Sequence, residues 1–242
     1  MLAGSLHTAW RWLFVVGVFA LGAYLQARGV IPSILQHRSD VLYLARQHMA
    51  LAGASGALAI AIGVPLGILL TRPRFRLLAA ILAQVVNLGS TIPTLAILAL
   101  AMTVLGLGAP SVIFGLTALT LLPIVLNTFA GLKAVPPHLI EAARGMGMKP
   151  RQILWQVELP NAFYIILAGI RTALAIDVGT VPLAFLIGGG GLGELIFTGI
   201  DLMEPGMLLA GAIPTALLAV LVDFAVGQAQ YWIVPRGVNP LR

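Results

Sequence analysis

The chain has 242 residues, of which 60% are hydrophobic and only 9% are charged. Soluble globular proteins carry about 25% charged residues, so this composition excludes an ordinary soluble domain. Repeated apolar stretches of about 20 residues match a bilayer core, which predicts an integral membrane protein in contact with lipid. The net charge of +6 is loop charge that orients the chain, so nucleic acid is not an expected partner. The chain has no cysteine, which excludes disulfides and thiolate metal sites.

Hydropathy along the chain predicts an all-α polytopic bundle of about six transmembrane helices. The expected ranges, in chain order, are 10–26, 48–70, 78–105, 112–132, 161–187 and 207–232. The third stretch contains Gly89-Ser90-Thr91-Ile92-Pro93, and Pro93 lacks a backbone donor, so a kink or break is expected there. An odd number of spans stays open, because the third stretch could be miscounted.

Lysine and arginine counts predict the orientation of these spans, because cytoplasmic loops are richer in basic residues. Three basic residues fall on one side, namely Arg28, Arg38 and Arg46. Ten fall on the other side, namely Arg11, Arg72, Arg74, Arg76, Lys133, Arg144, Lys149, Arg151, Arg236 and Arg242. The second side is therefore expected to be cytoplasmic, with both termini on it.

A polar segment, "EAARGMGMKPRQILWQVELP" at residues 141–160, interrupts the apolar pattern. Gly145 and Gly147 are expected to end one short helix, because glycine accepts the left-handed conformation of a helix C-terminus. Pro150 is expected to open a second short helix, and Pro160 to begin the fifth span. The apolar faces of two such helices are too small to form a core. The segment must dock on a partner, on its own bundle or in the membrane interface.

Seven residues of this segment carry a resemblance to a known family. The positions are Glu141, Ala142, Ala143, Gly147, Val157, Leu159 and Pro160. Their spacing resembles the EAA signature of ABC-importer permease subunits, E-A-A-x(3)-G-x(9)-I-x-L-P, with Val157 in place of isoleucine. The resemblance implies that residues 134–159 form a cytoplasmic coupling loop that docks on an ATP-binding cassette subunit.

Longer stretches, including "LAGIRTALA" and "IGGGGLGELIFTGI", are similar to permeases of glycine betaine, choline and carnitine importers over about residues 45–230. The resemblance implies a methionine-importer-like fold in a bacterial inner membrane. Together with the predicted spans, it divides the chain into three expected domains: 1–44 with the first membrane helix and an external loop, 45–233 as the permease domain, and 234–242 as a cytoplasmic tail. The expected partners are ATP-binding subunits, a second permease subunit and an extracytoplasmic substrate-binding protein. ATP would bind the partner subunit, so no cofactor is expected here.

Two ionisable residues are expected at one depth in the membrane. At 1.5 Å per residue, Arg171 lies about 16 Å from Pro160, and Asp223 about 14 Å from Trp232. A charge at mid-bilayer needs a partner, so we expect Arg171 and Asp223 to pair between the last two helices. A role in the substrate path is the alternative.

Asp177, Thr180 and a glycine-rich segment are candidates for the translocation path or its gate. Asp177 lies about 25 Å from the cytoplasmic face, where a carboxylate could face a water-filled cavity and attract a quaternary ammonium group. The alternative is a hydrogen bond to Thr180, to Thr172 or to a neighbouring helix. Five glycines follow, at Gly188, Gly189, Gly190, Gly191 and Gly193, which predicts a mobile or tightly packed hinge at the external mouth.

Several activities lack the residues that they need. The sequence has no G-x-x-x-x-G-K-[ST] motif for ATP, no histidine spacing typical of a metal site and no catalytic constellation, so neither a metal nor an enzyme activity is expected. The main interpretation is an osmoprotectant importer permease. The alternatives are a permease for another small solute of the amino acid or methionine type, an ion-coupled secondary transporter or channel using Asp177, and an intramembrane enzyme.

Overall fold

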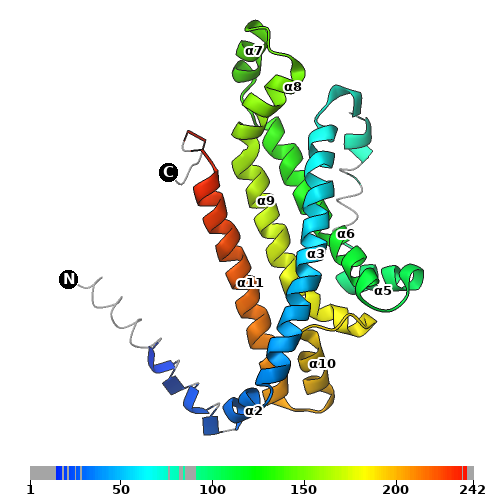
Figure 1. Cartoon of the computed structure of the whole chain (residues 1–242), viewed down its shortest axis with the longest axis vertical. Coiled ribbons are helices and arrows are strands. Elements are labelled where there is room, and N and C mark those ends of the chain that lie inside the picture. Colours follow the sequence, from blue (N-terminus) through cyan, green and yellow to red (C-terminus); the bar gives the residue numbers. More distant parts are fainter. Residues whose placement is uncertain are drawn as a thin grey trace, which may run out of the picture.

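The computed structural model describes residues 15–238 apart from 18, 21, 25, 28, 76, 82, 83, 85–90 and 236. That part of the chain is helical and contains no strand. Among the described residues, four helical segments are long and apolar enough to cross a membrane, namely α3 (Arg38–Leu70), α6 (Ala109–Lys133), Pro150–Ile187 and α11 (Pro205–Ile233). They lie along the long axis of the molecule, with α3 packed on α6, α6 on α9 (Leu159–Thr180) and α9 on α11 (Figure 1).

Short helices close the two ends of this bundle. At one end α7 (Pro137–Gly145) and α8 (Pro150–Ile153) project beyond the long helices, and we call this the hairpin end (Figure 1). The short 3₁₀ helix η1 (Pro73–Phe75) follows α3 at this same end. At the opposite end, called the α10 end, lie α10 (Gly193–Asp201) and α2 (Val30–Gln36). The 3₁₀ helix η3 (Val181–Ile187) leads from α9 toward α10.

The long helices agree with the expected second, fourth and sixth spans, although α3 begins ten residues before residue 48. Residues 10–14, 18, 21 and 25 of the expected first span lie outside the described residues, and its described residues between 15 and 24 are helical. The expected third span, 78–105, is interrupted at Pro93, where the sequence predicted a kink or break. Its helix α5 (Thr94–Leu105) has 12 residues, about 18 Å, which is too short to cross a bilayer core. Pro93 precedes it with an extended backbone, ψ 135°, which interrupts the helix.

Pro160 does not begin a separate helix, which corrects the expected start of the fifth span. One continuous helical segment runs from Pro150 to Ile187. It contains the π-helical turn η2 (Leu154–Glu158), where the N–H of Leu159 donates to the carbonyl of Leu154, five residues back. A π-turn widens the helix, and this widening lets a proline, which has no N–H, follow it without ending the segment.

Small residues let the long helices approach each other closely. A Cβ built at Gly67 would lie 2.9 Å from the carbonyl oxygen of Val125 and 2.8 Å from a methyl group of Thr128, both on α6. The same construction at Gly53, on the same helix, meets nothing within 4 Å. Close contact of backbones is the usual way that helices associate in lipid, so α3 and α6 form the tight seam of the bundle.

Candidate functional site

The hairpin formed by α7 and α8 is built by its prolines and by one glycine. Prolines occupy the first turns of both helices, where no backbone donor is needed. Gly147 adopts φ +78° and donates to the carbonyl of Arg144 at 2.9 Å, while Met148 donates to the carbonyl of Ala143 at 3.1 Å. These two bonds are those of a Schellman C-cap. Gly145 stays helical as the last residue of α7, so only one of the two expected glycines makes the turn.

Apolar residues fix the base of the hairpin to the bundle. Ala143 and Ile153 are buried, at 1% and 5% exposure. Partly buried Ile140, Leu154 and Leu159 pack against a core cluster that includes Ala162 of α9. The hairpin therefore docks on its own bundle through one face, which is one of the alternatives that the sequence left open.

The opposite face of the hairpin is free to meet a partner in this single chain. Glu141, Ala142 and Gly147 are exposed, and Met146 at the tip is 74% exposed. The signature residues Val157, Leu159 and Pro160 are instead partly buried at the base. The motif thus combines an outward-facing part with an anchoring part. Basic residues Arg144, Lys149 and Arg151 lie on this projecting unit, at the same end as Arg72 and Arg74 (Figure 1).

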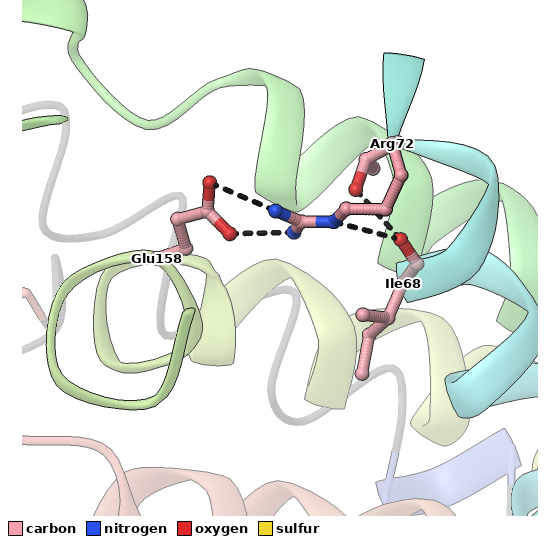
Figure 2. Close-up of polar contacts among 4 residues, drawn as sticks. Ile68, Arg72 and Glu158 are labelled. Carbon is pink, nitrogen blue, oxygen red and sulfur yellow. Dashed lines mark hydrogen bonds and ion pairs between the residues drawn. The ribbon is translucent and has the colours of Figure 1, made fainter. Parts of the chain in front are cut away.

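An ion pair that the sequence reasoning did not identify joins the base of the hairpin to the end of α3. Figure 2 shows the guanidinium of Arg72 facing the carboxylate of Glu158, with nitrogen–oxygen distances of 2.5 and 3.3 Å. The Nε of Arg72 also points to the carbonyl of Ile68, at 3.4 Å. The side chains are 31% and 13% exposed. The predicted topology puts both residues on the same side of the membrane, and nothing else in the sequence indicates that they pair.

Arg171 and Asp223 form a bidentate ion pair between α9 and α11. Nε and Nη2 of Arg171 donate to the two carboxylate oxygens at 2.6 and 2.5 Å. Gly227 leaves room for the guanidinium, because a Cβ there would lie 3.0 Å from its carbon. The pair is about 40% exposed and lines a hollow of about 450 Å³ together with Gln228 and Tyr231. The geometry therefore suits a bridge between helices, and it also leaves the pair open to a surface hollow of mixed polar and apolar lining.

Asp177 is fully buried between α9 and α3. One carboxylate oxygen lies 2.7 Å from the hydroxyl of Ser55, and the other has no hydrogen-bond partner. Thr180 instead donates to its own helix, at the carbonyl of Ile176. Thr172 also bonds within α9, to Ala168. The partner of Asp177 is thus a neighbouring helix, and in this conformation the carboxylate does not reach a cavity.

The five glycines between η3 and α10 form a packed turn. Gly188, Gly190 and Gly191 have φ between +75° and +84°, a conformation that favours glycine. The N–H of Gly191 donates to Oε1 of Gln47 at 3.2 Å. At Gly189 a Cβ would overlap Val112, and at Gly193 it would overlap the backbone of Pro182. The turn is therefore packed tightly against α3 and α6, and its part as a hinge stays a prediction.

A bundle of long apolar helices with a projecting, partly polar hairpin at one end defines a polytopic membrane protein. The chain belongs to the family of binding-protein-dependent transport system inner membrane components, whose model matches residues 63–237. The chain is a permease component of an ABC transporter, and it folds as a helical membrane bundle.

Relatives and solved structures agree with this assignment. The chain is 52% identical to the osmoprotectant import permease protein OsmY of Salmonella typhimurium, over 80% of this chain and 82% of that protein. It is 39% identical to the carnitine transport permease protein OpuCB of Listeria monocytogenes, over 88% and 97% of the two chains. Its structure is similar to an inward-facing MetNI methionine ABC transporter, with a TM-score of 0.73, 25% identity and coverage of 81% and 96%.

Proposed function

We propose that this chain forms the translocation pathway of an ATP-driven importer for osmoprotectants of the glycine betaine, choline and carnitine type. The observation that carries the proposal is the exposed face of the hairpin, Glu141, Ala142 and Gly147, on a chain 52% identical to an osmoprotectant import permease. Relatives from Bacillus subtilis named for choline and for glycine betaine/carnitine/choline support the same substrate class. A methionine-type substrate is the alternative, which the fold alone does not separate.

The hairpin is the proposed docking element for the ATP-binding cassette subunits. Its outer face is polar and small, its turn is fixed by Gly147, and its base is anchored on the bundle. A rigid, anchored projection transmits a displacement, whereas a flexible loop would absorb it. ATP hydrolysis would take place on the partner subunit, so this chain needs no catalytic residue of its own.

The proposed orientation puts the hairpin end in the cytoplasm, with the N- and C-termini on that side. The basic residues of the hairpin and of the segment after α3 support it, because cytoplasmic loops are enriched in lysine and arginine. The α10 end would then face the extracytoplasmic substrate-binding protein. A second permease subunit, identical or related, would complete the pathway.

We place the external gate at the glycine-rich turn, residues 188–193, next to Asp177 and Thr180. The turn is held by Gln47, and Asp177 is closed off by Ser55. A solute would meet this carboxylate only after α3 and α9 had separated. The proposed part of Asp177 is therefore to hold the closed state, while Arg171 and Asp223 brace the last two helices.

The test is reconstitution of the permease in proteoliposomes with its ATP-binding subunit and binding protein. We expect ATP-dependent uptake of radiolabelled glycine betaine, competed by choline or carnitine and not by methionine. Glu141→Lys, on the exposed face, should abolish co-purification of the ATP-binding subunit while the permease still inserts. Arg151→Glu, also exposed on the hairpin but outside the signature, is the matched control. Uptake without nucleotide, or full uptake by Glu141→Lys, would refute the proposal.

A further inference from the structure

We propose that α3 carries the movement of the hairpin to the glycine-rich turn at the opposite end, and that Arg72 and Glu158 form its input joint. The inference rests on the proposed function, since it concerns how the docking element drives the gate. It assigns a positioning role to two residues outside the consensus positions of the signature.

The input joint lies where three elements meet. Glu158 is the last residue of η2, between the hairpin and α9, and Arg72 stands two residues beyond the last residue of α3. Two nitrogens of Arg72 face the carboxylate and the third faces the carbonyl of Ile68, so the guanidinium is held on both sides (Figure 2). With only 13% of the Glu158 side chain exposed, water screens this pair less than a surface pair.

Between its ends α3 is held against the bundle, and close contacts on either side of Pro65 restrain the bend that a proline inside a helix favours. Its 33 residues extend about 50 Å as an α-helix. Gly67 brings α3 against the backbone of α6 at Val125, and Gly63 lies against the side chain of Ile124 on α6. At Gly56, α3 meets Leu174 of α9. Contacts this close leave little room for local bending. A displacement at one end of α3 is therefore carried to the other end by the helix as a body.

The output end touches the glycine-rich turn through two neighbouring residues. Gln47 accepts a hydrogen bond from the N–H of Gly191. Gly191 also lies against His48, because a Cβ built at Gly191 would be 3.5 Å from the Cα of His48. The ring of His48 is buried, with Nε2 2.9 Å from the carbonyl of Val178. A carbonyl only accepts, so Nε2 donates. The same residues thus join α3, the end of α9 and the turn.

A merely structural ion pair would also lower stability when broken, so the experiment must separate coupling from folding. The complete transporter in proteoliposomes is compared for wild type, Arg72→Glu, Glu158→Arg and the double exchange. The ratio of solute imported to ATP hydrolysed is measured. Arg74→Glu is the matched control, an exposed arginine two residues away with the same change of charge.

The expected single variants hydrolyse ATP but import about tenfold less solute per ATP, a typical size for a coupling effect. The double exchange should recover most of that ratio, and Arg74→Glu should keep it. Wild-type ratios in the single variants, or no recovery in a double exchange that assembles, overturn the inference. Where a reversed charge prevents assembly, Glu158→Gln, which keeps the shape of the side chain, and Arg72→Gln, which removes the charge with a shorter side chain, carry the same test.

A second readout reports on the α10 end directly. The chain has no cysteine, so Leu202→Cys, 65% exposed after α10, supplies one labelling site. In the wild-type background its rate of reaction with an impermeant maleimide should change on ATP binding. In the Glu158→Gln background that change in labelling rate should be lost while ATP hydrolysis continues. A Glu158→Gln protein whose labelling rate changes as in wild type would contradict the inference. If the wild-type assembly imports nothing, it is the proposed function that fails.

Discussion

The guanidinium of Arg171 on α9 holds both carboxylate oxygens of Asp223 on α11, at 2.6 and 2.5 Å, in the membrane-spanning part of the bundle. Each side chain is about 40% exposed, so the pair is only partly shielded from its surroundings. It joins two helices that are consecutive spans of the chain, with the glycine-rich turn and α10 between them.

Removal of one partner of this pair should destabilise the protein. Asp223→Ala leaves the charge of Arg171 uncompensated. Insertion scales put the free-energy cost of such a charge at mid-bilayer at about 2.5–3.5 kcal/mol, and the partial exposure of Arg171 lowers this cost. We expect a lower melting temperature in detergent for Asp223→Ala and for Arg171→Asp. The double variant that exchanges the two residues, Arg171→Asp with Asp223→Arg, should recover most of the lost melting temperature. An exchange no better than the single variants would argue against pairing; lost uptake at an unchanged melting temperature would place the pair in the substrate path.

Asp177→Asn should preserve both folding and uptake. The asparagine keeps the shape and the contact with Ser55, and it avoids any burial of a charge. In Asp177→Leu the hydroxyl of Ser55 keeps the carbonyl of Leu51 as an acceptor at 2.8 Å, so we expect a destabilisation of about 1–3 kcal/mol from fitting the larger side chain into a packed site. Thermal unfolding and glycine betaine uptake measure the two effects separately. Uptake that falls about tenfold in a stable Asp177→Asn protein would instead show that the carboxylate contacts the cationic solute.

Gly67→Ala should weaken the seam between α3 and α6. The added methyl would press on the carbonyl of Val125 and on Thr128, and overpacking typically costs about 1–3 kcal/mol. Gly53→Ala is the matched control on the same helix, since nothing lies within 4 Å of its Cβ. We expect that control to be neutral or to gain as much as about 1 kcal/mol from helix propensity. Equal melting temperatures for the two variants would contradict the close approach seen at Gly67.

Gly147→Ala should loosen the hairpin turn without unfolding the bundle. An L-residue in the left-handed conformation costs roughly 1–2 kcal/mol, and Gly147 has φ +78°. Binding of the ATP-binding subunit should therefore weaken, measured by co-purification or by its concentration dependence. Gly145→Ala is the control, because Gly145 is helical and its Cβ would meet open space. Stronger loss in the control than in Gly147→Ala would mean that the turn is not the part that docks.

Much of the fold followed from local pattern. Apolar length predicted α6 and α11 to within three residues of each end, because a membrane helix satisfies its own backbone and needs little else to specify it. The breaks were harder. Pro160 looked like a helix start, yet η2 absorbs it, since a π-turn is stabilised by packing at the base of the hairpin and not by any residue type.

The site was predictable where chemistry repeats at fixed spacing and was missed where it depends on tertiary contact. The signature residues from Glu141 to Pro160 mark the hairpin directly. Arg72 and Glu158 are 86 residues apart, and nothing local distinguishes Arg72 from Arg74. The partner of Asp177 was equally hidden, because Ser55 lies 122 residues earlier on another helix. The pair of Arg171 and Asp223 was predicted from their equal depth in the membrane, because depth can be estimated by counting residues from the end of each helix.

The π-turn at Leu154–Glu158 holds one residue more than an α-helical turn would. If it were tightened into regular α-helix, the surplus residue would have to leave the turn, and α8 would rotate about the α9 axis by about 100°, the angle of a single residue. The outer face of α7 would turn with it. A change of one residue in the winding of this turn would therefore reorient the proposed docking surface by a large angle.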